Sequence, residues 1–341
     1  MARTKLPEID SEGLRQAKKK GAELVSSAAR VSLDKPSSGG GGLYFGSPKT
    51  DVDFIPSGST MLDLALGGGW ARRRIANIIG DRSTGKTLLA IEAAANFNII
   101  EPKANIRYRE AESAFEPSYA EALGFPVDKV DFGDPIETIE DLFEDLSRVI
   151  EGARGPEAYF VDSLDALSDR DEMARDIDKG SFGAQKAKKL SELFRRLIRE
   201  LASKDVTVFI ISQVRDNIGV TFGRKWARSG GRALDFYTSQ ALVLSQVEKI
   251  YREISKIKRV TGILVKGQVD KNKIGLPYRE AEFPIMFGYG IEDFKSCAEF
   301  WKKVTGEIVS KETTLEELQR MVRKEWWEIE NKFLPKETKY K

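Results

Sequence analysis

The sequence predicts an α/β fold with a mostly parallel central sheet and helices on both faces of that sheet. Two observations predict this class. From about residue 50 to residue 292, apolar runs typical of buried strands alternate with segments of helical periodicity, and chains that alternate in this way form parallel sheets. A glycine-rich stretch, GDRSTGKT (80–87), also lies between a strand-like run and a helical run.

The predicted elements follow one another in chain order. Short apolar runs predict the strands Ile75–Ile79, Asn105–Tyr108, Ala158–Val161, Val206–Ser212, Ala241–Leu244 and Ile263–Val265. Apolar residues at helical spacing predict the helices Lys86–Ile100, Ile136–Ile150 and Ala184–Ala202. Each of these helices lies between two predicted strands, as a parallel sheet requires.

The segments that flank this core differ from it in composition. Ser11–Leu33 is typical of a polar helix with a stripe of small residues, and SSGGGG (37–42) after Pro36 is typical of a flexible linker. We therefore expect a helical oligomerisation arm over residues 1–36, a linker over 37–49, the core over 50–292 and a small C-terminal module over 293–341. The residues leave open whether the N-terminal helix is a mobile tail or an arm that docks on another subunit.

Composition excludes several classes of protein. The 341 residues carry a formal net charge of +2, so any nucleic-acid site must rest on local charge. The absence of histidine excludes acid–base catalysis by imidazole and leaves carboxylates, lysines or bound water for proton transfer. The chain has no apolar run near the roughly 20 residues that span a bilayer, no signal-peptide pattern and a single cysteine, Cys297. These features predict a cytoplasmic protein that does not enter membranes.

The stretch GDRSTGKT matches G-x-x-x-x-G-K-[ST], the pattern of a phosphate-binding P-loop. Glycines let the backbone curl so that its N–H groups point at phosphate oxygens, and the following helix N-terminus attracts the same charge. Lys86 is expected to bind the β- and γ-phosphates of ATP, and Thr87 to ligate Mg²⁺. The predicted ATP-binding loop comprises Gly80, Asp81, Arg82, Ser83, Thr84, Gly85, Lys86 and Thr87.

A P-loop also needs a carboxylate near its metal ion, at the end of a neighbouring strand. Asp162 ends the apolar run in EAYFVDS (157–163) and is expected to hold Mg²⁺ with Thr87, through a water molecule. Hydrolysis further requires a group that orients or deprotonates water, and YREAESAFEP (108–117) offers Glu110, Glu112 and Glu116. Spacing alone does not choose among these three carboxylates.

A basic segment follows the predicted strand that ends near Gln213. The segment TFGRKWARSGGRALDF (221–236) carries four cationic side chains, one tryptophan and a Gly-Gly pair. It is either a solvated surface loop or a segment that binds a polyanion. The tryptophans near the C-terminus, Trp301, Trp326 and Trp327, are interpreted instead as core of the small module.

Several motifs occur in order: GDRSTGKT, EAESAFEPSYAEALG, YFVDSLDAL, IISQVRDNIGVTFG with SGGRALDFY, and VDKNKIGLPYREAEFPIMFGYGI. Together they resemble the bacterial RecA recombinases over roughly Phe54–Glu292. The resemblance implies a RecA-type P-loop ATPase core and a DNA-dependent ATPase that forms a helical filament on single-stranded DNA. It further implies homologous pairing and strand exchange with double-stranded DNA, ATP and Mg²⁺ as cofactors, and copies of this chain as partners.

The resemblance also implies roles for single residues. Glu112 resembles the glutamate that activates water, Gln213 the glutamine that senses the γ-phosphate, and Tyr119 the aromatic residue that stacks on adenine; with Lys86, the first two form the expected catalytic set. Lys271 and Lys273 resemble lysines that reach the ATP of a neighbouring subunit. Two DNA-binding loops are implied, with candidate contacts Phe182, Gly183, Arg215, Ile218, Phe222, Arg224, Lys225, Arg228, Gly230, Gly231 and Arg232. ATP sensed by Gln213 would order the second loop, and ADP would release it.

The chain departs from the family pattern at several positions. The phosphate loop holds Asp-Arg-Ser-Thr where the family usually has Pro-Glu-Ser-Ser, and AES replaces AEH. Asp235 stands where the family usually carries an interface lysine, which weakens the coupling between ATP and assembly unless Arg232 compensates. These departures suggest a divergent, phage-encoded member. Two alternatives stay open: a ring-forming helicase or branch-migration motor on the same core, and a protein that coats single-stranded DNA with little ATP turnover.

Overall fold

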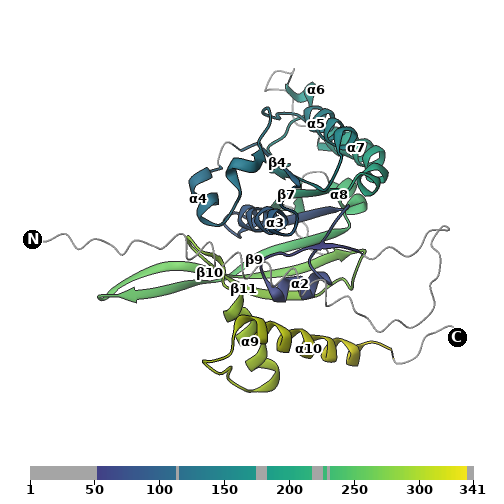
Figure 1. Ribbon diagram of the computed structural model, residues 1–341. Helices are drawn as coiled ribbons and strands as arrows, with labels where there is room; N and C mark the ends of the chain where they lie inside the picture. The colour runs from purple at the N-terminus through teal and green to yellow at the C-terminus, as the bar shows by residue number, and fades with distance from the viewer. Residues whose placement is uncertain (1–51, 113–114, 174–182, 217–225, 229–230, 336–341) are drawn as a thin grey trace, which may run out of the picture.

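The computed structural model describes residues 52–112, 115–173, 183–216, 226–228 and 231–335 (Figure 1). The expected arm and linker therefore lie outside the described residues. A short two-stranded sheet pairs β1 (Phe54–Ile55) with β2 (Trp70–Ala71). The main sheet is formed by β3 (Ile75–Gly80), β4 (Asn105–Glu110), β5 (Val130–Asp131), β6 (Glu157–Asp162), β7 (Val206–Asp216), β8 (Trp226–Arg228), β9 (Gln240–Ile254), β10 (Ile257–Asn272), β11 (Glu280–Met286) and β12 (Gly290–Ile291).

The order of strands in the main sheet is β12-β11-β10-β9-β3-β7-β6-β4-β5, and β8 pairs with β7 beside this path. The part from β9 to β5 is parallel throughout. From β9 to β12 the neighbours are antiparallel. The prediction of an α/β fold with a mostly parallel central sheet is confirmed.

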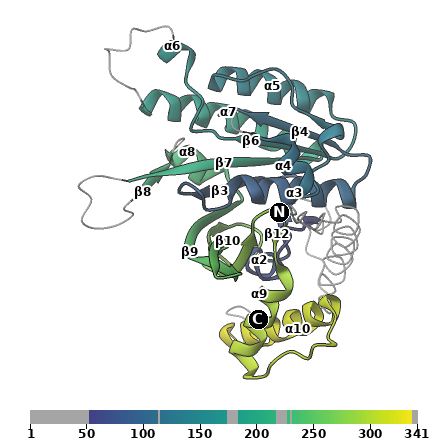
Figure 2. The ribbon, with the colours of Figure 1, turned by 90° about the vertical axis from the view of Figure 1, so that its left-hand side faces the viewer.

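Helices cover both faces of this sheet, as Figure 2 shows for α5 and α7 on one side. The helices are α2 (Thr60–Leu66), α3 (Lys86–Ile100), α4 (Pro117–Ala122), α5 (Ile139–Gly152), α6 (Arg170–Met173), α7 (Gly183–Ser203), α8 (Gly231–Tyr237), α9 (Asp293–Thr305) and α10 (Leu315–Phe333), with a 3₁₀ turn at Val127–Lys129. Strand β7 shows why two layers form, because its successive side chains point to opposite faces. Val208 and Ile210 pack with α5 and α7, whereas Phe209 and Ile211 pack with α2 and α3.

Local sequence signals set the ends of several helices. Thr138 and Asp141 form a capping box at the start of α5, because each side chain accepts a hydrogen bond from the other residue's backbone N–H. Thr314 and Glu317 form the same arrangement at α10. Helix α2 ends at Gly67, whose φ of 85° favours glycine. The predicted helix Lys86–Ile100 has the same bounds as α3.

The antiparallel part of the sheet differs from the sequence prediction. The expected strands Ala241–Leu244 and Ile263–Val265 are only the buried portions of β9 and β10, which continue as a long hairpin away from the body of the molecule (Figure 1). Beyond the sheet the hairpin side chains are mostly exposed, among them Ile254 and Ile257. A solvated two-stranded ribbon lacks the apolar periodicity that marks a buried strand, so the pattern predicted only its base.

Helices α9 and α10 follow β12 and pack beneath α2 and β11 (Figure 1). Asp293 joins the two regions, since its carboxylate accepts hydrogen bonds from Thr60 N and Thr60 Oγ1, both at 2.7 Å, and from Gln319 Nε2 at 2.8 Å. Buried Cys297 and Leu318 belong to the same apolar cluster as the α2–α3 side of the sheet. The tryptophan ring of Trp326 lies 5.8 Å from that of Phe300.

Candidate nucleotide-binding and catalytic site

The candidate site lies where the parallel strands β3, β4, β6 and β7 end. The register pairs Gly80 with Gln213 and Glu110 with Asp162, so the carboxyl ends of these strands meet along one edge. Such an edge is where ligands bind in open α/β sheets, because the following loops and helix N-termini converge there. The residues predicted from GDRSTGKT, YREAES, FVDS and IISQ are thereby brought together.

The segment between β3 and α3 is a tightly curled loop. Ser83 has a φ of 57°, and Gly85, which precedes α3, has a φ of 89°. This backbone angle favours glycine, and a Cβ atom at Gly85 would in addition lie 2.5 Å from Cδ1 of Ile285, so that side chain would have to move. Lys86 begins α3, and its ammonium donates a hydrogen bond to the carbonyl of Asp81 at 2.7 Å.

Opposing influences act on the charge of Lys86. Partial burial lowers the pKa of its ammonium, while the carboxylates of Asp162, Glu112, Asp81 and Asp165 act in the opposite direction. Burial dominates, because loss of water costs the charged form more than these carboxylates restore. A ligand with several negative oxygens placed at the loop would supply the missing counter-charge.

Asp162 is the buried acidic group of the site and is 8% exposed. Its Oδ2 accepts hydrogen bonds from Thr87 Oγ1 and from the Tyr108 hydroxyl, each at 2.8 Å. Burial raises the pKa of this carboxyl, with the hydrogen bonds acting against the rise. A hydroxyl and a carboxylate held together at a phosphate loop match the oxygen ligands that Mg²⁺ prefers, so these residues fit the implied metal.

The structure distinguishes the three candidate glutamates. Glu116 caps α4, where its Oε1 accepts hydrogen bonds from Ser118. Glu110 ends β4, and its Oε1 accepts a hydrogen bond from the backbone N–H of Glu112 at 2.9 Å. The Oε1 atom of Glu112 accepts hydrogen bonds from Ser163 Oγ, just past β6, at 2.5 Å and from Gln213 Nε2, in β7, at 2.7 Å.

Tyr119 lies in α4, beyond β4, and the residue is 42% exposed. Partial burial and the neighbouring carboxylate of Glu92 raise the pKa of its hydroxyl. An aromatic face of this exposure, on the element that follows β4, is available to a flat ligand such as a nucleobase.

Lys271 and Lys273 lie at the end of β10, with their ammonium groups on the C-terminus of α8. Lys271 donates to the carbonyls of Asp235 and Phe236, and Lys273 donates to Phe236 O at 3.0 Å. Cations are stabilised at this end of a helix, because its last carbonyls lack intrahelical partners. In this chain the two lysines therefore bind α8, the helix in which the basic segment ends.

The structure describes part of the two predicted DNA-binding regions. Phe182, Ile218, Phe222, Arg224, Lys225 and Gly230 lie outside the described residues. Gly183 begins α7, and Gly231 and Arg232 begin α8. The strand predicted to end at Ser212 instead continues to Asp216, so Arg215 is a strand residue, and β7 pairs there with Ala227 and Arg228 of β8.

Sequence reasoning missed two residues that complete the site. The Ser163 hydroxyl, fully buried, is one of the two donors to Glu112. Asp165 Oδ2 accepts a hydrogen bond from the backbone N–H of Gln213 at 2.6 Å. Both belong to the stretch DSLD after β6, and their position just past a strand end was the available signal.

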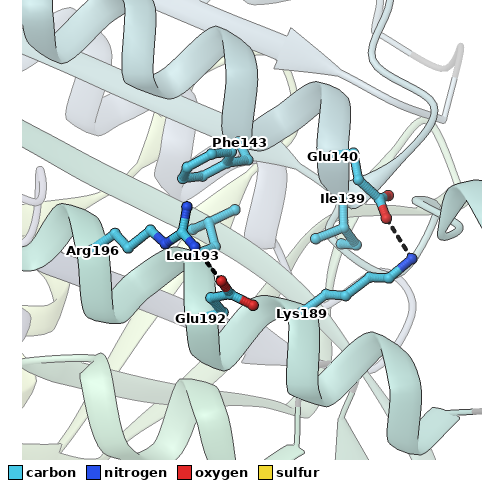
Figure 3. Close-up of a pocket in the computed structure, with 7 residues that line it drawn as sticks. All are labelled: Ile139, Glu140, Phe143, Lys189, Glu192, Leu193 and Arg196. Atoms are coloured by element: carbon cyan, nitrogen blue, oxygen red, sulfur yellow. Dashed lines mark hydrogen bonds and ion pairs between the residues drawn. The ribbon is translucent and has the colours of Figure 1, made fainter.

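A cavity of about 180 Å³ lies away from this site, between α5 and α7 on the outer face. In Figure 3 the ring of Phe143 faces Arg196, and Lys189 reaches Glu140. Lys189 also lies within 3.5 Å of Asp169 and 3.0 Å of Asp171, so its ammonium is neutralised by acids of its own chain. None of the phosphate-loop residues lines this cavity.

Among the described residues, the helices are too short or too polar to cross a bilayer.

The fold and the site together define a P-loop nucleotide-binding protein of the α/β class. Comparison with known proteins is more specific: the model of the RecA N-terminal domain matches residues 28–292. Protein RecA of Nostoc punctiforme is 34% identical over 261 residues, covering 76% of this chain and 70% of the relative. Protein RecA of Lactobacillus delbrueckii subsp. bulgaricus is 35% identical over 243 residues, covering 71% of each. The chain belongs to the RecA family, which confirms the resemblance inferred from its motifs.

Proposed function

We propose that this chain is an ATP-dependent DNA recombinase that forms a helical filament on single-stranded DNA and promotes homologous pairing and strand exchange. One observation carries the proposal: Gln213, which lies on the strand leading to the basic segment, donates a hydrogen bond to Glu112, the carboxylate expected to act on water. A change at the nucleotide site therefore has a direct route to the candidate DNA-binding region. Membership of the RecA family supports the same function.

The nucleotide would be held by residues that already converge. The loop from Gly80 to Thr87 would hold the phosphates, and Lys86 would supply the positive charge that neutralises them. Thr87 and Asp162 would hold Mg²⁺, which neutralises phosphate charge when bound. Tyr119 would stack on the base. Glu112 would accept a proton from water or orient it, since the chain has no histidine for this role.

Coupling to DNA would run along β7. A γ-phosphate competes with Glu112 for the amide of Gln213, so ATP and ADP would leave this side chain in different positions. The β7–β8 ribbon and the basic segment that contains β8 would respond, presenting cations to the DNA backbone. Phosphate contacts of this kind give affinity without sequence preference, as a recombinase requires.

Assembly would use the two lysines of β10. Lys271 and Lys273 bind the carbonyl end of α8 within the chain, and we propose that in a filament they turn toward the ATP of the adjacent protomer. A head-to-tail interface whose rotation does not close produces an open helix. Double-stranded DNA would be engaged by the assembled filament during strand exchange.

Electron microscopy of the full chain with single-stranded DNA and a slowly hydrolysed ATP analogue tests this function. We expect open helical filaments, and steady-state ATP hydrolysis that rises when DNA is added. Closed rings without filaments would favour a ring motor on the same core. Slow hydrolysis that is equal with and without DNA would favour a protein that only coats DNA.

A further inference from the structure

The segment Asp162–Asp165 joins the two strand ends that flank it. On one side, the carbonyl of Asp162 accepts a hydrogen bond from Ala111 N at 2.8 Å, next to Glu112. On the other side, the backbone N–H of Leu164 donates to Ile211 O at 3.0 Å. The segment therefore continues the sheet contacts past the end of β6, whose pairing with β7 ends at Val161 and Ile210.

Side chains complete this bridge beyond the last backbone pair. Ser163 Oγ donates to Glu112 Oε1, and Asp165 Oδ2 accepts from the backbone N–H of Gln213 at 2.6 Å. Strand β6 has already ended at this level, so the carboxylate of Asp165 takes the place of a strand carbonyl. Hydrogen bonds from a backbone N–H to a carboxylate are shorter and stronger than those between neutral groups.

The bond at Asp165 fixes the backbone from which two functional parts extend. The side chain of Gln213 reaches Glu112 in one direction. In the other direction β7 continues as Val214–Asp216 and pairs with β8. Without an acceptor at Asp165 the Gln213 N–H would lack this partner, and both the amide side chain and the ribbon would lose a common point of attachment.

We propose that Asp165 is a positioning residue that couples the nucleotide site to the β7–β8 ribbon by fixing the backbone of Gln213. The inference rests on the proposed function and goes beyond it, because it assigns the coupling to a residue outside the expected catalytic set. Asp165 is hydrogen-bonded to the backbone of Gln213, and its charge also acts on Lys86. If the hydrogen bond is what matters, substitution of Asp165 should change turnover and the response to DNA more than the binding of ATP.

A purely electrostatic role makes a different prediction. Asp165 is one of the carboxylates that raise the pKa of the Lys86 ammonium. If its charge were what mattered, removing the charge would lessen the repulsion of the triphosphate and strengthen ATP binding at Lys86. Glutamate, which carries the same charge, would then replace aspartate without loss of activity.

Three variants of the full chain separate the two roles: Asp165→Ala, Asp165→Asn and Asp165→Glu. The readouts are kcat and KM for Mg-ATP hydrolysis with and without oligo(dT), and oligo(dT) affinity with ADP and with a slowly hydrolysed ATP analogue. For Asp165→Ala and Asp165→Glu we expect the DNA-stimulated kcat to fall about tenfold, with KM changed less than about twofold. The oligo(dT) affinity with the ATP analogue, divided by the affinity with ADP, should fall by a similar factor. Asparagine retains an acceptor at the same place and should stay within about threefold of the wild type.

The outcomes decide between the roles even if Asp165→Ala does not fold. Two results together would overturn the positioning role and favour a role of charge. The Asp165→Glu variant would hydrolyse ATP as the wild type does, and the Asp165→Asn variant would show a reduced kcat and a lowered KM. Unchanged turnover and coupling in both Ala and Glu would overturn it outright, while leaving the proposed function intact. A wild-type chain whose hydrolysis ignores DNA would instead overturn the proposed function, and this inference with it.

Discussion

Gln213 and Glu112, which are 101 residues apart in the sequence, are joined by a hydrogen bond of 2.7 Å from Nε2 to Oε1. The same oxygen of Glu112 accepts a second hydrogen bond from Ser163. The carboxylate expected to act on water is thus bonded to the side chain expected to sense the phosphate. A movement of either side chain therefore alters a hydrogen bond that the other side chain shares.

The first prediction concerns Glu112. Glu112→Gln should lower DNA-stimulated ATP hydrolysis by about 10²- to 10⁴-fold, because the amide neither accepts a proton from water nor carries the negative charge. ATP binding should survive, since Lys86, Thr87 and Asp162 are unchanged. Steady-state hydrolysis and equilibrium binding of a fluorescent ATP analogue measure the two effects.

Glu116→Gln is the matched control, because Glu116 caps α4 and lacks contacts with Gln213 or Ser163 in the bonds described. It should hydrolyse ATP nearly as fast as the wild type. Loss of activity in the Glu116 variant alone would show that the wrong glutamate was assigned.

The second prediction concerns the basic segment. The triple variant Arg224→Ala, Lys225→Ala, Arg228→Ala should weaken single-stranded DNA binding and reduce the slope of log affinity against log salt by about two to three, because fewer counterions are released. Fluorescence anisotropy over a salt series measures this slope. A control variant with three substitutions on the exposed outer face, Arg148→Ala, Arg195→Ala and Arg199→Ala, removes the same number of positive charges away from the basic segment. An unaltered slope in the first triple would identify the segment as a solvated loop.

The third prediction tests whether Lys271 and Lys273 act across an interface. Glu112→Gln protomers and Lys271→Ala, Lys273→Ala protomers should each be inactive alone. Mixed in equal amounts they should recover about a quarter of wild-type hydrolysis, since about that share of head-to-tail interfaces combines an intact glutamate with intact lysines. Mixtures that stay inactive would mean that the lysines serve only α8 of their own chain.

The fourth prediction concerns pH and the buried carboxyl of Asp63. Its Oδ1 accepts a hydrogen bond from Ser57 N at 2.8 Å, whereas Oδ2 is buried without a hydrogen-bond partner among the described residues. Burial raises its pKa from 3.8 to about 7. Between these values the folded chain holds a proton that the unfolded chain has lost, so this group's contribution to stability is present at low pH and falls as pH rises toward 7.

Urea unfolding of the wild type and of Asp63→Asn between pH 5 and pH 8 isolates this contribution. The free energy of unfolding of the wild type should fall by about 3 kcal/mol relative to the variant over this range, because the variant has no proton to lose there. Parallel pH curves for the two proteins would contradict the raised pKa.

Local sequence was sufficient wherever the relevant atoms lie within one short segment. The phosphate loop is eight consecutive residues, and its glycines, Lys86 and Thr87 are specified by backbone geometry over that distance. The bounds of α3 follow for the same reason. The parallel sheet was also predictable, since buried strands read as apolar runs.

Tertiary structure decided what depends on strands meeting. The glutamates at positions 110, 112 and 116 are equivalent by spacing. The resemblance to the RecA family pointed to Glu112, and the hydrogen bonds from Gln213 and Ser163 give that choice a structural reason. By sequence Asp165 is an ordinary turn residue, and only the fold shows that its carboxylate accepts a hydrogen bond from the backbone of Gln213 in β7. The sequence by itself determined a phosphate-binding loop on a parallel sheet, because those features are encoded in contiguous backbone. The connection from that loop to the basic segment required the fold, because it consists of hydrogen bonds between side chains and strand ends that only the sheet register brings within reach.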